Sequence, residues 1–526
     1  MAAESDMAQM MMAAESDMAQ MMTAAESDVA QITTAAAGDV VPVASATAAA
    51  RPHDFTLQYP IRREYFLDTF VQQAPARIRK RRHNGARLVA AGAEALESSI
   101  AETVADLAES RPPLLVYVHV PFCASKCTYC NFAVDTRQTS TLHAAYVHAL
   151  GRQMAALEAM LPPDKILGGI DIGGGTPTLL STSLLRELLD QLAPLRARVA
   201  PSLEHPLSIE TTPAIASAEP DKMAALVAGS VDRISMGLQS SSAAVLRDLN
   251  REAQVDAPAR AADAIHAAGF KRFSVDIIFG LPDQTMEMWM ADVAAAIALA
   301  PDAITTYDCL YRGKGRVMTR HTAAAALPSW RRHYGPMYDA AYDALAAAGY
   351  VAPYGSVNYS RQPGETGTSA YFEARLRDGA PYIGLGNYAS SLLGGPLDTW
   401  AFAPYTVDGY LAAIDADNLF PADFAYALPT SELAAKTALL QLTFGSVDLT
   451  RLARSLGCDV DAVAAELGPG IAAACESGWL APAAPGSNVF SVQHGAFAAM
   501  PSVRALFHTR GSLQWYQAQL RATTAR

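Results

Sequence analysis

From residue 114 to residue 311 the chain alternates six short apolar segments with helical segments, and this alternation constrains the fold more than any other feature. The segments are LLVYVHV (114–120), GGIDIGGGTP (168–177), SLEHPLSIETTP (202–213), VDRISMGLQ (231–239), FSVDIIFGLP (273–282) and DAITTYDCLY (302–311). Helices are expected between them at 140–160, 182–195, 220–228, 256–268 and 286–299. Strands that are continuously hydrophobic are buried on both faces, so the pattern predicts parallel βα units in an α/β fold. Such units form either a doubly wound sheet or a full or partial α/β barrel, with function at the C-terminal ends of the strands.

The rest of the chain divides into regions around this predicted core, which we place at 113–320. Residues 1–50 carry an eleven-residue repeat, MAAESDMAQMM and its variants, which favours a poorly ordered tail over a helical docking arm. Residues 51–112 are expected to be a helical extension, with a basic cluster at 77–82 and a helix over 86–109. Residues 321–405 are expected to complete the barrel mouth. Residues 406–526 are expected to form a small, mainly helical domain that covers the substrate, with short strands near 478–492.

Composition excludes several classes of protein. The 526 residues are 51% hydrophobic and carry a net charge of −12, so the chain can bury a large core and is a poor nucleic-acid binder. We find neither an unbroken apolar run long enough to cross a membrane nor a secretory signal pattern. Six cysteines in a chain of this length are not a disulfide framework, which indicates a reducing cytoplasm.

Three of the six cysteines lie close together, directly after the first predicted strand. Cys123, Cys127 and Cys130 form C-x-x-x-C-x-x-C, whereas Cys309, Cys458 and Cys475 are isolated. A structural zinc site usually takes four protein ligands, often as two pairs, and no second pair is present. Three thiolates on one loop suit a 4Fe–4S cluster with one iron left open for another ligand. The motif therefore predicts an iron–sulfur site.

Further candidate residues lie at the ends of successive strands. The glycine run GGGTP (173–177) follows the second strand and allows a ligand to approach the backbone closely, although a tight turn would explain it equally well. Glu210 closes the third strand, Gln239 the fourth, and Asp276 lies in the fifth. Polar residues that converge from neighbouring parallel strands indicate a ligand site.

These segments, in this order, resemble the radical S-adenosylmethionine (SAM) enzymes related to oxygen-independent coproporphyrinogen III oxidase. The resemblance rests on YVHVPFCASKCTYCNF, DIGGGTP, SIETTP, DRISMGLQSSS with LNRE, and FSVDIIFGLPDQT, and continues more weakly through YGSVNYSRQ, IGLGNYASS and PTSELAAKTALLQLTFG. It implies a partial (β/α)6 TIM-like barrel, a 4Fe–4S cluster on Cys123, Cys127 and Cys130, and two SAM molecules. By the same similarity, Tyr117, Gly174 and Glu210 would bind the first SAM. The residues matching the seat of the second are Tyr129, Gly175, Thr176, Gln239, Arg251, Asp276 and Leu310.

Departures from the family motifs favour one branch. The oxidases carry a further cysteine where this chain has Phe132, and the heme chaperones carry a heme-ligating His-Asn-x-x-Tyr-Trp stretch where this chain has Gly367–Phe372. By elimination, the chain is closest in type to the class C methyltransferases and cyclopropanases of natural-product biosynthesis. In these, a SAM-derived methylene radical adds to an sp2 carbon. Oxidative decarboxylation of coproporphyrinogen III and heme binding remain the alternatives.

The resemblance also implies partners. An unsaturated or aromatic small molecule would be the substrate, and a flavodoxin or ferredoxin the electron donor. A companion pathway enzyme could complete the product. Neither a nucleic acid nor a membrane is expected as a partner.

Overall fold

The computed structural model describes residues 87–89, 113–130, 132–251, 256–281, 283–308, 328–393, 399–422, 424–427 and 430–507. The predicted repeat tail (1–50) and almost all of the predicted extension (51–112) lie outside these residues. At the start of the helix expected over 86–109, the structure instead has a short strand, β1 (Arg87–Val89), which pairs with strand β12 (Phe424–Ala427). Strand pairing across a long sequence separation gives no local signal, so helical periodicity alone was misleading there.

The six predicted strands are all present and form a parallel sheet in chain order. Each strand pairs in parallel with the next one along the chain. They are β2 (Leu114–Val120), β3 (Leu167–Gly174), β4 (Leu207–Thr211), β5 (Arg233–Gln239), β6 (Arg272–Phe279) and β7 (Ala303–Asp308). The α/β class and the partial (β/α)6 barrel are thereby confirmed.

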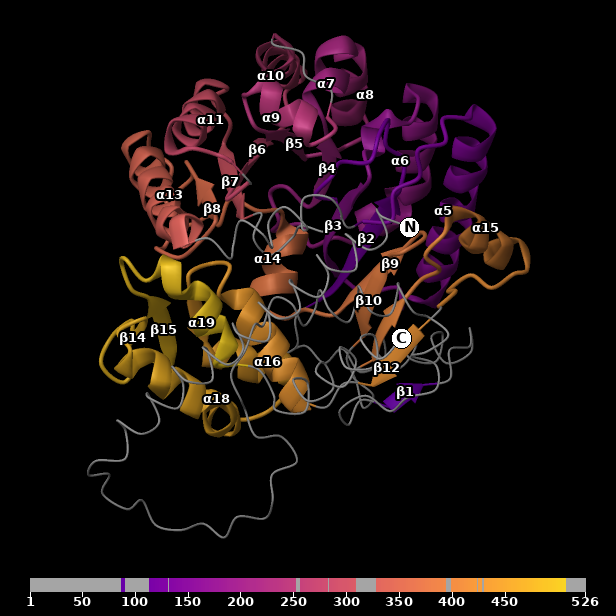
Figure 1. Cartoon of the computed structure of the whole chain (residues 1–526). Helices are drawn as coiled ribbons and strands as arrows, with labels where there is room; N and C mark the ends of the chain where they lie inside the picture. The colour runs from indigo at the N-terminus through magenta and orange to yellow at the C-terminus, as the bar shows by residue number, and fades with distance from the viewer. Residues whose placement is uncertain are drawn as a thin grey trace, which may run out of the picture.

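Helices cover one face of this sheet and follow its curve, as Figure 1 shows in purple, magenta and red. They are α5 (Ser140–Met160), α6 (Thr182–Ala197), α7 (Pro213–Ala218), α8 (Pro220–Ala228), α9 (Ala243–Asp248), α10 (Ala257–Ala268), α11 (Met286–Ala298) and α13 (Pro328–Ala347). Local sequence explains their starts, since Ser181, Ser242 and Thr285 cap α6, α9 and α11 by accepting a backbone N–H. In α6, leucines at 185, 188, 189, 192 and 195 form the buried stripe that packs on the sheet.

The two faces of the parallel sheet differ in chemistry. Val116, Ile172 and Ile209 are fully buried in the hydrophobic core beneath the helices. The alternate positions face the inside of the barrel, and register places their polar side chains beside one another: Tyr117 pairs with Asp171, Asp171 with Ser208, Glu210 with Ser235, Ser235 with Ser274, and Asp276 with Thr305. The expectation of strands that are apolar on both faces is therefore wrong for the inner face, which is largely buried but polar.

Other segments extend the sheet at both edges. Strand β9 (Tyr382–Leu385) pairs in parallel with β2, and β10 (Ser390–Leu393), β11 (Thr399–Phe402), β12 and β1 follow in antiparallel order. At the opposite edge, β8 (Asn358–Ser360) is antiparallel to β7. Helix α14 (Ala370–Arg377) contacts β2 and β3. Because Tyr371 of α14 lies 5.9 Å from Tyr117, ring centre to ring centre, this helix lies against the inner face.

The C-terminal part combines helices with a second, small sheet. Strands β13 (Ser446–Asp448), β15 (Val489–Val492) and β14 (Leu480–Pro482) form it in that order, two of them at the predicted position. The helices are α15 (Val407–Asp415), α16 (Thr430–Gln441), α17 (Leu449–Leu456), α18 (Val460–Glu476) and α19 (Met500–Ala505). Within the described part of the chain, no helix combines the length and hydropathy needed to cross a membrane. The domain limits themselves stay predictions.

Candidate active site

The three clustered cysteines lie on the loop that leaves the C-terminal end of β2. The backbone N–H of Cys123 donates to the carbonyl of Asp135 at 3.1 Å, and that of Cys130 to the carbonyl of Cys127 at 3.1 Å. All three thiols are half-buried. Burial raises the pKa of the Cys123 thiol, and likewise that of Cys130, to about 11. These two thiols need a metal or a cation to become thiolates at neutral pH.

The spacing of the cysteines bears on the kind of metal centre. Two thiolates on one tetrahedral zinc ion, each at about 2.3 Å from the metal, lie about 3.8 Å apart. Among the described residues, just one group of three or more potential ligands has its ligand atoms within 4.8 Å of one another, and the cysteines are not part of it. The three cysteine sulfurs therefore do not all lie within 4.8 Å of one another. Such a separation suits thiolates that each bind a different iron of a cubane. The residues therefore fit a 4Fe–4S cluster.

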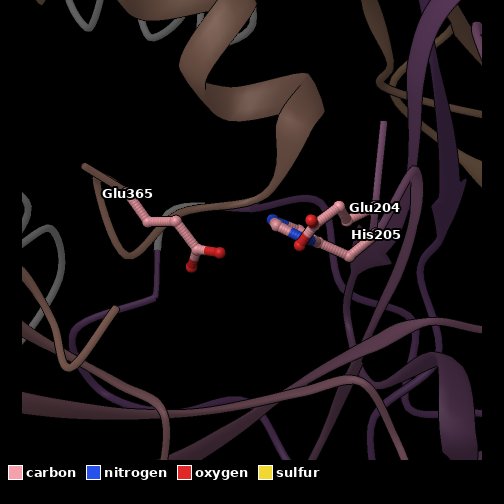
Figure 2. Close-up of side chains that lie close together, drawn as sticks. All are labelled: Glu204, His205 and Glu365. Carbon is pink, nitrogen blue, oxygen red and sulfur yellow. The ribbon is translucent and has the colours of Figure 1, made fainter. Parts of the chain in front are cut away.

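The compact group that does meet this limit is Glu204, His205 and Glu365, shown in Figure 2. It lies just before β4, at the opposite end of the strands from the cysteine loop. Arg272 lies 3.3 Å from Glu204 and 2.6 Å from Glu365, so the carboxylates already face a cation. The sequence did not predict this group, and it is not part of the cysteine site.

The glycine run after β3 contacts the cysteine loop through its backbone. Gly175 donates its N–H to Val120 at 2.8 Å, and Thr176 donates its own to Phe122 at 2.7 Å. The hydroxyl of Thr176 lies 3.5 Å from the sulfur of Cys123. Gly174 has a φ of +116°, where a side chain would be strained, and a Cβ there would lie 2.5 Å from the ring of His119. The glycines are therefore required by close approach as well as by the turn.

Carboxylates line the inner face beside this loop. Glu210 accepts the N–H of Gly174 at 3.3 Å, and Asp276 accepts the hydroxyl of Ser235 at 3.0 Å. Water reaches the side chain of Glu210, yet protein surrounds it on most sides. This enclosure, together with the nearby carboxylates of Asp276 and Asp171, raises the pKa of Glu210 to about 8. A cationic ligand would relieve the mutual repulsion of these acids.

Arg251 joins the cysteine loop to β5. Its guanidinium donates to the hydroxyl of Tyr129 at 3.0 Å, to the carbonyl of Gly237 at 2.9 Å and to the sulfur of Cys127 at 3.9 Å. Gln239, at the end of β5, has a positive φ of 66° at a register shift between β5 and β6. The structure thus brings Tyr129 and Arg251, both assigned to the second SAM by similarity, within hydrogen-bond distance of each other; their role in binding SAM stays a prediction.

Tyr117 lies deeper in the barrel, next to a histidine. Its hydroxyl is 3.3 Å from Nδ1 of His119; the side chain of His119 is buried and that of Tyr117 is half-buried. Burial lowers the pKa of His119 to about 4, so its ring is neutral at physiological pH. Leu310, predicted for the second SAM, lies outside the described residues.

Two features of the site were not predicted from the sequence. Asp171 lies on the inner face next to Tyr117 and accepts the hydroxyl of Ser369 at 2.7 Å, across 198 positions of sequence. The segment 248–251 binds the cysteine loop through several hydrogen bonds. The LNRE sequence (249–252) marks this second feature, and the prediction used only its arginine.

Comparison with known proteins agrees with this geometry. The model of the radical SAM superfamily matches residues 117–296. The heme chaperone HemW of Escherichia coli is 33% identical over 197 residues, which is 38% of this chain and 50% of that protein. The HemW of Lactococcus lactis is 30% identical over 54% of this chain and 70% of that protein. The oxygen-independent coproporphyrinogen III oxidase of Pseudomonas aeruginosa is 29% identical over 45% of this chain and 51% of that protein. The chain thus spans about half the length of several curated relatives that it matches.

The structural comparison extends further along the chain. Coproporphyrinogen III oxidase (HemN) from Escherichia coli superimposes with a TM-score of 0.61 and 20% identity, over 79% of this chain and 93% of that one. This likeness confirms the fold. The predicted closeness to class C methyltransferases is not confirmed by these relatives. By its sequence matches and the site they cover, this chain belongs to the radical SAM family, with coproporphyrinogen III oxidases and heme chaperones among its homologues.

Proposed function

We propose that this chain is a redox enzyme that cleaves SAM reductively at the C-terminal ends of β2 to β6 and uses the resulting radical to abstract hydrogen. The observation that carries the proposal is the contact between three elements: the cysteine loop, the glycine run and the carboxylate of Glu210. Membership of the radical SAM family implies a 4Fe–4S cluster and SAM. Binding of two SAM molecules, with Tyr129, Gly175, Thr176, Gln239, Arg251 and Asp276 around the second, is part of the proposal.

The residues of this chain would bind, orient and enclose SAM. Cys123, Cys127 and Cys130 would hold the cluster, which when bound supplies the electron that splits SAM into methionine and a 5′-deoxyadenosyl radical. Glu210 would accept hydrogen bonds from the amino group of SAM. Because the pKa of Glu210 is about 8, most of the population is protonated at pH 7 when no ligand is bound, and a cationic ligand would favour the carboxylate form. The largely buried inner face would limit the access of water to the radical.

Two reactions are candidates for the hydrogen abstraction. The names of the relatives favour oxidative decarboxylation of coproporphyrinogen III, in which hydrogen would come from the substrate. Particular residues of this chain favour methyl or methylene transfer from the second SAM. Phe132, 45% exposed, stands in place of the oxidases' additional cysteine. Ser369 is buried and bound to Asp171 within the segment where the chaperones carry a heme-ligating histidine. We therefore keep the transfer reaction as the second candidate and regard heme delivery as disfavoured.

One labelling experiment tests both the general proposal and its two branches. The protein is reconstituted anaerobically with iron and sulfide, reduced with dithionite and given SAM deuterated on its methyl group. 5′-Deoxyadenosine is then analysed by mass spectrometry, with coproporphyrinogen III or with unsaturated small molecules. Unlabelled deoxyadenosine that depends on coproporphyrinogen III, with loss of carbon dioxide, supports the oxidase. Deuterated deoxyadenosine with S-adenosylhomocysteine supports transfer.

The Cys127→Ala variant provides the control for cluster-dependent chemistry. The proposal would be refuted if the wild-type protein, reconstituted with iron and sulfide, formed no more deoxyadenosine than this variant with each of the substrates tested. A cytoplasmic site of action, a flavodoxin or ferredoxin as reductant and a companion enzyme acting on the product belong to the same proposal.

A further inference from the structure

The cysteine loop is held by the segment Asp248–Arg251, which begins at the last residue of α9, and we call this segment the strap. Thr128 donates its N–H to the carbonyl of Leu249 at 3.0 Å and its hydroxyl to that of Asp248 at 3.3 Å. Ser125 donates its hydroxyl to the carbonyl of Asn250 at 3.0 Å, and the amide of Asn250 donates to the carbonyl of Lys126 at 2.9 Å. The strap therefore binds the loop on both sides of Cys127.

Arg251 is the last residue of the strap and contacts the sulfur of Cys127. One terminal nitrogen, Nη1, donates both to the Tyr129 hydroxyl and to the Cys127 sulfur, while the other, Nη2, donates to the carbonyl of Gly237 in β5. Tyr129 itself packs in a small apolar cluster with Leu249 of the strap. Both ends of the guanidinium are thus fixed, so its charge is held next to one cluster ligand.

We propose that Arg251 is a positioning residue that sets the reduction potential of the iron–sulfur cluster through its charged hydrogen bond to Cys127. The inference rests on the cluster that the proposed function places on these cysteines. Reduction adds negative charge to a cluster held by three thiolates. A cation and an N–H donor at one of the sulfurs stabilise the reduced form more than the oxidised form, which raises the potential.

The test is a potentiometric titration of the reconstituted protein without SAM, followed by electron paramagnetic resonance. Arg251→Met removes the charge and the donors while keeping an unbranched side chain. We expect the ratio of reduced to oxidised cluster at a fixed potential to fall about tenfold, which for a one-electron couple corresponds to a shift of about 59 mV to lower potential. The matched control is Arg247→Met, which removes an exposed charge from the last turn of α9. Because solvent and salt screen that charge, the control should titrate like the wild type.

Each outcome decides the proposal. A potential of Arg251→Met equal to that of the wild type or of Arg247→Met would overturn it. If Arg251→Met does not retain its irons, Arg251→Gln, which keeps N–H donors without the charge, is titrated instead, with a lowered potential again expected. If neither variant retains a cluster, Arg251 builds the loop rather than tuning the potential, and the proposal fails.

The test also separates this inference from the proposed function. A wild-type protein that binds no cluster would overturn both. A protein whose cluster shows the predicted dependence on Arg251 but never cleaves SAM would overturn the proposed function alone.

Discussion

Replacing Gly175 with alanine should damage the site through the backbone rather than through any reactive group. A Cβ at Gly175 would lie 2.6 Å from the carbonyl oxygen of Pro121 and 2.7 Å from that of Phe122. Ordinary contacts of a Cβ begin at 3.4 Å, so the first is short by about 0.8 Å. A side chain could change its rotamer to avoid this overlap, but backbone atoms cannot. Cys123 follows Phe122 directly, so a shift of the Phe122 backbone also displaces a cysteine of the motif. The added methyl group therefore has to push the cysteine loop and the glycine run apart.

The size of the effect follows from this displacement. Overpacking a filled site costs about 1–3 kcal/mol of stability. A misplacement of about 1 Å in a site that depends on orientation costs about 100-fold in rate. We therefore expect Gly175→Ala to lower the free energy of unfolding by about 1–3 kcal/mol and to slow formation of 5′-deoxyadenosine about 100-fold.

The assay combines urea unfolding, iron content after anaerobic reconstitution and the rate of SAM cleavage. Gly468→Ala is the matched control, since a Cβ at this position in α18 meets no atom within 4 Å. Alanine has the higher helix propensity, but Pro469 follows directly and its ring crowds a Cβ on the residue before it. These two effects oppose each other, so the control should be as active as the wild type and within about 1 kcal/mol of its stability. Wild-type iron content and cleavage rate in Gly175→Ala would refute the argument that close backbone contact forms the site.

Three other substitutions test single features of the site. Cys127→Ser should abolish cluster absorbance and SAM cleavage while leaving the urea midpoint of the apoprotein near that of the wild type; full iron content would contradict the ligand assignment. Burial lowers the pKa of His119 from 6.5 to about 4, so below pH 6.5 the unfolded chain binds a proton that the folded protein does not. The wild type should therefore lose about 3 kcal/mol of unfolding free energy between pH 6.5 and pH 4 on account of this residue. His119→Phe should lack that loss. Parallel pH–stability curves for variant and wild type between pH 7 and pH 4 would show that this reasoning is wrong. Glu210→Gln should unfold at higher urea than the wild type at pH 9 and at the same urea at pH 4, since a carboxyl whose pKa rises from 4.5 to about 8 destabilises the fold as the pH rises through that range. The same variant should bind SAM more weakly, and equilibrium dialysis showing unchanged affinity would remove Glu210 from the site.

The elements that the sequence predicts well are those whose signal is local. Strand β2 was expected at 114–120 and lies at Leu114–Val120, because a β-branched apolar run between turn residues has few alternatives. The cysteine motif and GGGTP are likewise short, and both lie where they were expected. Helix α6 follows from its serine cap and its leucine stripe.

What the sequence did not reveal depends on contacts between distant segments. Ser369 and Asp171 are joined across 198 positions, and β1 pairs with β12 across more than three hundred, so neither leaves a periodic pattern. The strap was missed for a different reason. Most of its bonds to the cysteine loop use backbone carbonyls, which any residue supplies. The sequence therefore predicted only Arg251, and the contact of the Asn250 side chain with the loop was not predicted.

The position of the acidic residues follows from the apolar residues beside them. Ile209 and Val275 are fully buried in the core under the helices, and this forces their neighbours Glu210 and Asp276 onto the inner face. A register slip of one residue would turn both carboxylates toward the helices and bury two charges in an apolar core, which is strongly unfavourable. The hydrophobic effect that holds the helices on the sheet therefore also fixes which side chains face the cysteine loop. The pattern of apolar residues along each strand therefore indicates which of its polar residues face the site, even when those polar residues are far apart in the sequence.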